Sequence, residues 1–128
     1  MTIKISWNQY NHMPHDTFRW IGVDGSEVLT HFMSTPAISD NGGYTYNGVI
    51  DPVSVKGEWD LYHDKEINQD LLLAYGNGDG GGGVNRDMLE MGRHLKAMPG
   101  LPRVTPGTAY DYLKTSEDRC QNRSSCTH

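Results

Sequence analysis

The sequence has few features of a disulfide-stapled or membrane-spanning protein. It contains only two cysteines, Cys120 and Cys126, and their C-x5-C spacing fits neither a zinc knuckle nor a redox C-x-x-C pair. We expect both to be free thiols, because a single pair near one end of the chain makes a poor disulfide framework. No apolar run approaches the roughly 20 residues that a membrane-spanning helix needs. The first ten residues, MTIKISWNQY, contain no signal-peptide h-region.

Basic charge is also scarce. The chain has 11 basic against 16 acidic residues, which gives a formal net charge of −5. This balance offers no electrostatic attraction to nucleic acid or to an anionic membrane, so we expect neither as a partner. The 128 residues suffice for one domain, and the hydrophobic fraction of 36% still includes runs able to build a core.

The front of the chain reads as strands joined by polar loops. Ile3 to Trp7 is a short strand candidate, and two β-prone runs flank Asp24-Gly25, a strong hairpin signal. The long polar stretch from Ser34 to Asp51 has no apolar periodicity, and we expect a substrate-facing loop there. The sequence thus predicts an antiparallel excursion near the N-terminus.

From Asp51 onward, helix signals alternate with apolar runs. Asp51 and Pro52 form a cap and a first helical turn, and a second helix opens at Asn85 or Asp87. A third helix is expected to start with Thr105 as its cap and Pro106 in its first turn.

The intervening runs, DLLLAYG and PGLPRV, suggest a buried strand and a short strand. Helix and strand in alternation predict the α/β class, with partial parallel βα layers and right-handed crossovers. Residues 115–128 lack an apolar pattern, so we expect a domain over 1–114 followed by a disordered or non-native tail.

The stretch YGNGDGGGG places one carboxylate, Asp79, among six glycines. Three interpretations stay open. The loop could bind phosphate at a helix N-terminus, although no Lys-Ser or Lys-Thr pair follows it and Asp79 would repel the anion. Asp79 could serve only a tight Asp-Gly turn. Alternatively, the glycines leave room for a bulky sugar beside an acid whose pKa is raised by desolvation.

Three longer segments resemble the α-mannosidases of glycoside hydrolase family 38, and most closely the bacterial and cytosolic type. They are KISWNQYNHMPHDTFRWIGVDGSEVLTHF, TYNGVIDPVSVKGEWDLYHDKEINQDLLLAYGNGDGGGG and LKAMPGLPRVTPGTAYDYL. The resemblance implies a fragment of a (β/α) glycosidase catalytic domain, a cytoplasmic location, and an α-mannoside oligosaccharide substrate cleaved with retention of configuration. Retention requires two carboxylates, one a nucleophile and the other an acid/base.

The resemblance places Asp79 at the acid/base position and Lys4 near the catalytic centre. Lys4 would meet a sugar hydroxyl or the charge of the nucleophile. Trp7 and Trp20 are candidates for stacking on the sugar ring, although tryptophans in strands more often belong to a core.

The family enzymes bind zinc through a His-x-Asp motif, an Asp that is also the nucleophile, and a later His. None of these motifs appears here, so the resemblance implies zinc in the intact enzyme and we assign no metal ligand in this chain. We expect the isolated chain to be inactive and to self-associate through exposed sheet edges. Three alternatives remain: a non-catalytic mannose-binding module, a phosphate- or nucleotide-binding α/β domain, and a piece that completes an active site with another polypeptide.

Overall fold

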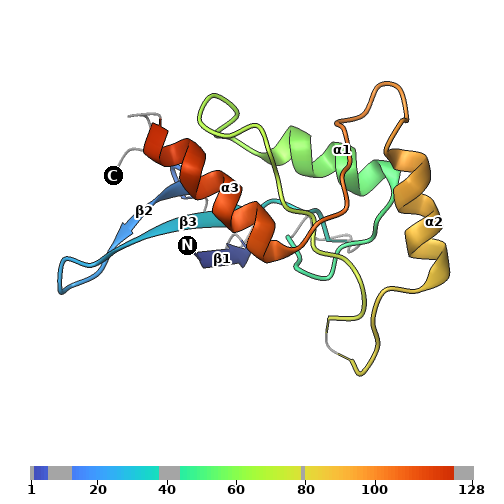
Figure 1. Ribbon diagram of the computed structural model, residues 1–128, viewed down its shortest axis with the longest axis horizontal. Helices are drawn as coiled ribbons and strands as arrows, with labels where there is room; N and C mark the ends of the chain where they lie inside the picture. The colour runs from blue at the N-terminus through green and yellow to red at the C-terminus, as the bar shows by residue number, and fades with distance from the viewer. Residues whose placement is uncertain (1, 6–12, 38–43, 79, 123–128) are drawn as a thin grey trace.

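The computed structural model of the protein describes residues 2–5, 13–37, 44–78 and 80–122, of which 2–5, 121 and 122 are described by their backbone alone. Within these ranges the regular structure is a mixed sheet and three helices (Figure 1). The strands lie in the order β1-β3-β2. The elements are β1 (Thr2–Ile5), β2 (Thr17–Ile21), β3 (Glu27–Met33), α1 (Pro52–Leu61), α2 (Arg86–Leu95) and α3 (Ala109–Asn122).

The hairpin at Asp24-Gly25 is confirmed. Strands β2 and β3 pair antiparallel, and the amide of Gly25 donates to the carbonyl of Gly22 at 2.9 Å across the turn. Gly25 has a φ of +81°, which explains a glycine there. The side chain of Asp24 accepts from the amide of Ser26 at 3.0 Å and fixes the turn further. Strand β1 pairs parallel with β3 over Thr2–Ile5, so the expected N-terminal strand also forms in its described part, and the rest of the predicted span lies outside the described residues.

Helices α1 and α2 begin where the sequence predicts. Oδ1 of Asp51 accepts from the amide of Ser54 at 2.6 Å, and Oδ1 of Asn85 accepts from the amide of Met88 at 2.9 Å. Both side chains satisfy amides that the first helical turn leaves unpaired. The two helices meet in a core made of Ile50, Val55 and Leu95.

The expected start of the third helix is wrong. Its cap is Thr108 rather than Thr105, because Oγ1 of Thr108 accepts from the amide of Asp111 at 3.2 Å and α3 starts only at Ala109. The helix continues to Asn122, into the segment for which we expected a disordered or non-native tail. Cys120 is buried and disulfide-bonded, so the expectation of a free thiol at that position is also wrong.

Parallel βα layers do not form in the described part of the chain. DLLLAYG and PGLPRV are irregular segments, and the first makes only an isolated parallel bridge, between Gly48 and Tyr75. The α/β class thus holds only as a mixture of sheet and helix. The leucines of DLLLAYG are half-buried, which explains why the run looked like a buried strand. Among the described residues no helix is long and apolar enough to span a membrane.

Candidate functional site

The glycine-rich loop is held against the polar loop that precedes α1. The amide of Gly48 donates to the carbonyl of Ala74 at 2.9 Å, immediately before the glycines begin. A pocket of about 400 Å³ lies beside them, lined by Asn47, Asn77 and four of the glycines. A side chain at Gly78 would overlap the amide group of Asn47, and Gly76 has a φ of +128°. The backbone conformation therefore favours glycine at Gly76, whereas a side chain at Gly78 would fit only if the flexible side chain of Asn47 moved.

The structure does not bring the described site residues predicted from the sequence together at this loop. Asp79 and Trp7 lie outside the described residues. Lys4 is described by its backbone alone, which pairs with Phe32 in the sheet. Trp20 is half-exposed on β2, where its ring stacks on Phe18 at 6.1 Å. The hairpin that carries Trp20 projects away from the glycine-rich loop (Figure 1), so the structure does not bring these two together.

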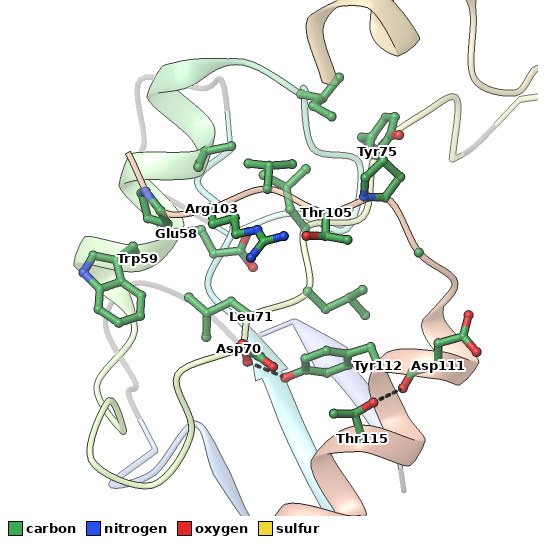
Figure 2. A pocket seen from close by; sticks show the side chains of 18 of the residues that line it. Glu58, Trp59, Asp70, Leu71, Tyr75, Arg103, Thr105, Asp111, Tyr112 and Thr115 are labelled. Atoms are coloured by element: carbon green, nitrogen blue, oxygen red, sulfur yellow. Dashed lines mark hydrogen bonds between the residues drawn. The ribbon is translucent and has the colours of Figure 1, made fainter. Parts of the chain in front are cut away.

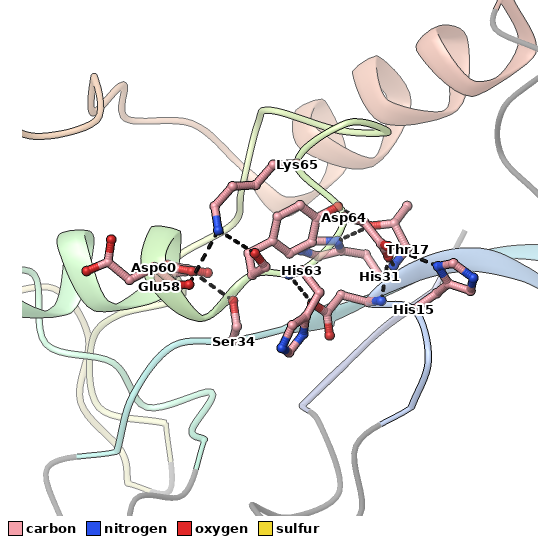
Figure 3. A network of polar contacts seen from close by, with 11 residues as sticks. His15, Thr17, His31, Ser34, Glu58, Asp60, His63, Asp64 and Lys65 are labelled. Atoms are coloured by element: carbon pink, nitrogen blue, oxygen red, sulfur yellow. Dashed lines mark hydrogen bonds and ion pairs between the residues drawn. The ribbon is translucent and has the colours of Figure 1, made fainter.

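Two crossed His–Asp pairs join β2 to the end of α1 (Figure 3). The ring of His15 donates to Asp64 at 2.9 Å, and the ring of His63 donates to Asp16 at 3.0 Å. Oδ2 of Asp64 also accepts from the amides of Asp16 and Thr17, at 2.6 and 2.8 Å, and Asp16 accepts from the amide of His63 at 2.7 Å. Each nearly buried carboxylate is therefore satisfied by backbone N–H groups as well as by a ring.

A neutral hydrogen-bonded chain continues inward from these pairs. Oγ1 of Thr17 contacts Nδ1 of His31 at 2.9 Å and the hydroxyl of Tyr62 at 2.7 Å. Desolvation lowers the pKa of His31 to about 4, against a weaker opposing effect of Asp64, so the ring is uncharged at neutral pH. Burial also raises the pKa of Tyr62 and of Tyr112, the α3 residue that packs on His31. These contacts link α3 to the sheet, because Tyr112 of α3 packs on His31 of β3.

The described residues do not form a zinc site. Among them no group of three or more His, Cys, Asp or Glu side chains is placed to hold a metal ion. The crossed His–Asp pairs have the donor types that zinc prefers, but their carboxylates are already engaged by amides and by each other's histidines. The part of the chain seen here therefore does not fit the metal, and no chemical step is assigned to one.

A second pocket, of about 530 Å³, contains a residue that sequence reasoning missed. Glu58 on α1 lies at its wall and is only 3% exposed (Figure 2). Burial raises the pKa of Glu58 to about 7, and the neighbouring hydroxyl of Thr35 opposes part of that rise. The sequence did carry a signal, since Glu58 follows buried Ser54 and Val55 at helical spacings of four and three.

Comparisons with known proteins agree with one another. The protein-family model described as "Glycosyl hydrolases family 38 N-terminal domain" matches residues 1–127. The chain is 39% identical over 117 residues to "Alpha-mannosidase G" of Dictyostelium discoideum, and 34% identical over 116 residues to "Alpha-mannosidase" of Saccharomyces cerevisiae. It is 38% identical over 119 residues to "Alpha-mannosidase 2C1" of Mus musculus. These alignments cover 91%, 87% and 89% of this chain but 10% of each relative, so the chain spans about a tenth of their length.

Proposed function

The chain belongs to glycosyl hydrolase family 38, and from this premise we propose that it forms part of the catalytic domain of an α-mannosidase. That enzyme removes terminal α-D-mannose from oligosaccharides with retention of configuration. The observation that carries the proposal is the family match over residues 1–127, supported by three relatives whose names specify α-mannosidase. We further propose a cytoplasmic location, on the basis of the sequence resemblance to the bacterial and cytosolic type.

Within this proposal Asp79 is the acid/base residue. It protonates the leaving glycosidic oxygen in the first step and deprotonates the attacking water in the second. Its chain neighbours Gly78 and Gly80 both line the pocket of about 400 Å³, which supports room for a sugar there. Lys4 and Trp7 are proposed to contact the substrate, Lys4 through a hydroxyl or the nucleophile and Trp7 through its ring. Trp20 is not included in this contact, because its hairpin projects away from the glycine-rich loop (Figure 1).

The isolated chain is proposed to be inactive. General acid catalysis alone contributes only about 10²- to 10⁴-fold, and the rest of a glycosidase's rate depends on a nucleophile and further groups that we do not assign to this chain. Purified protein incubated with an aryl α-mannoside and added zinc should show no turnover above background. Clear turnover that Asp79→Asn abolishes would show that this chain carries a complete site.

A chimera tests the proposed function itself. The matching tenth of the Dictyostelium enzyme is replaced by this chain, and hydrolysis of an aryl α-mannoside is measured. We expect activity in the chimera and a loss of about 10²- to 10⁴-fold on Asp79→Asn, the range typical of a general acid. The matched control is Asp87→Asn, which makes the same chemical change at an exposed position on α2.

An active chimera in which both variants behave alike would contradict the role of Asp79. An inactive chimera that still folds and binds mannose, detected by calorimetry, would favour the alternative of a sugar-binding module.

A further inference from the structure

The pocket of about 530 Å³, whose wall Figure 2 shows, shares no lining residue with the pocket beside the glycines and has its own chemistry. It lies between α1, the irregular segments 69–75 and 102–108, and α3. Leucine and valine side chains supply apolar wall, and three aromatic residues line it as well: Trp59, Tyr75 and Tyr112. Pockets of this size with an apolar wall and a few polar groups are the usual form of small-molecule sites.

Glu58 is the unexplained group in this pocket. Its side chain is almost completely buried, and its Oε1 atom has no hydrogen-bond partner among the described residues. A buried carboxylate oxygen without a partner is costly, and such groups in native proteins ordinarily meet a cation, a donor or a ligand. The hydroxyl of Thr35 lies close enough to oppose part of the rise in the pKa of Glu58, but it does not satisfy Oε1, since Oε1 of Glu58 and Oγ1 of Thr35 both lack a hydrogen-bond partner among the described residues.

The charges around the pocket favour a positive ligand. Three carboxylates line it, those of Glu58, Asp70 and Asp111, against one guanidinium, that of Arg103. Arg103 is exposed and makes no ion pair with any described residue, so it does not neutralise the carboxylate of Glu58. Asp70 pairs with Arg119 at 2.5 Å and Asp111 accepts from Oγ1 of Thr108 at 2.7 Å, whereas Oε1 of Glu58 has no partner among the described residues.

We infer that this pocket binds a small organic cation, an alkylammonium whose charged end meets Oε1 of Glu58 and whose apolar chain lies along the leucines. The aromatic rings at the wall add the attraction that cations have for ring faces. A carboxylate or phosphate ligand fits less well, because it would face the three acids. The inference does not depend on the proposed glycosidase function, since it uses none of the residues assigned there.

The test is an NMR titration of the ¹⁵N-labelled chain with n-butylammonium, with 1-butanol as the neutral probe of the same length. We expect shifts of amides around the pocket with the amine and weaker or no binding of the alcohol. Glu58→Gln should weaken amine binding about tenfold or more, because a charge-assisted hydrogen bond is lost. Glu66→Gln, the same change at an exposed position outside the pocket, should leave the affinity unchanged.

A second variant separates binding from folding. Arg103→Gln removes the only positive side chain at the pocket wall, so amine binding should become tighter. Loss of structure would weaken binding in both variants, whereas the inference requires opposite signs for Glu58→Gln and Arg103→Gln. The affinity for the amine should also rise between pH 6 and pH 8 in the wild type, as Glu58 ionises, and stay flat in Glu58→Gln.

Three results would overturn the inference. They are the absence of amine binding at millimolar concentration in the folded wild type, equal binding of 1-butanol, and a Glu58→Gln variant that binds the amine as the wild type does. Weaker binding in Arg103→Gln would instead indicate an anion site and would refute the cation.

Discussion

Glu58→Gln should stabilise the protein at alkaline pH and leave its stability unchanged in acid. Folding raises the pKa of Glu58 from 4.5 to about 7, because burial penalises the charged carboxylate. Between these values the native state keeps a proton that the unfolded state has released, so wild-type stability falls as pH rises from 4.5 towards 7. The gap of about 2.5 between the pKa values corresponds to about 3 kcal/mol, at 1.36 kcal/mol for each tenfold change in the equilibrium.

Glutamine has nearly the same shape as the protonated acid and does not ionise, so the variant avoids this loss. We expect the free energies of unfolding of the two proteins to agree near pH 4.5 and to differ by up to about 3 kcal/mol above pH 7, with the variant the more stable. That difference is a large part of the 5–15 kcal/mol typical of a domain.

The measurement is urea unfolding of both proteins at several pH values, followed by tryptophan fluorescence. The difference between the two proteins is the informative quantity, because His31 adds an opposite slope to each of them. Its pKa falls from 6.5 to about 4 on folding, so its contribution to stability rises with pH over that window and cancels in the comparison. A difference in the free energy of unfolding that does not change with pH, or a variant that is less stable than the wild type above pH 7, would refute the view that Glu58 is a buried carboxylic acid without a compensating partner.

Two further stability predictions rest on other contacts. Asp64→Ala leaves two buried backbone amides without their acceptor and should cost about 3–5 kcal/mol of stability. The control Asp60→Ala breaks only an exposed ion pair with Lys56 and should cost about 0.5 kcal/mol or less. Similar urea midpoints for the two variants would contradict the importance of the crossed His–Asp pairs. Gly25→Ala should cost about 1–2 kcal/mol of stability because of the positive φ at that residue. The control Gly107→Ala, where neither space nor φ opposes a side chain, should be neutral or slightly stabilising. Thermal unfolding checks both variants, and equal shifts in Tm would rule out a strained hairpin turn.

The sequence predicted best where a few adjacent residues determine the local structure. Asp24-Gly25 specifies a turn through a side-chain acceptor and a glycine with positive φ, and the hairpin forms there. Asp51 and Asn85 cap helices through a single side-chain oxygen that reaches an amide three residues on. These interactions depend little on the rest of the fold, which is why they could be read from the chain alone.

The sequence failed where an element needs distant partners or where two local signals compete. A strand at DLLLAYG requires a hydrogen-bonded neighbour, and the described chain offers only the bridge between Gly48 and Tyr75. Thr105 and Thr108 both look like helix caps. The second is favoured because Asp111 three residues on completes a capping pair, while Gly107 disfavours an earlier start.

The polar sites were less predictable still. Nothing in the sequence spacing joins His15 to Asp64 or His63 to Asp16, because these contacts exist only once β2 lies beside the end of α1. Glu58 could have been noticed as an acid on the apolar face of a helix, but the pocket that it faces is built from segments far along the chain. Its function therefore had to be inferred from three-dimensional proximity.

The dependence of rate on the leaving group tests the assignment of Asp79 most directly. In the chimera with the Dictyostelium relative, kcat/KM is measured for phenyl and for 2,4-dinitrophenyl α-mannoside, in the parent and in Asp79→Asn. A dinitrophenolate departs without a proton, so an acid/base variant should cleave that substrate at nearly the parent rate and lose about 10²-fold or more on the phenyl substrate. An equal loss on both substrates would contradict proton donation by Asp79.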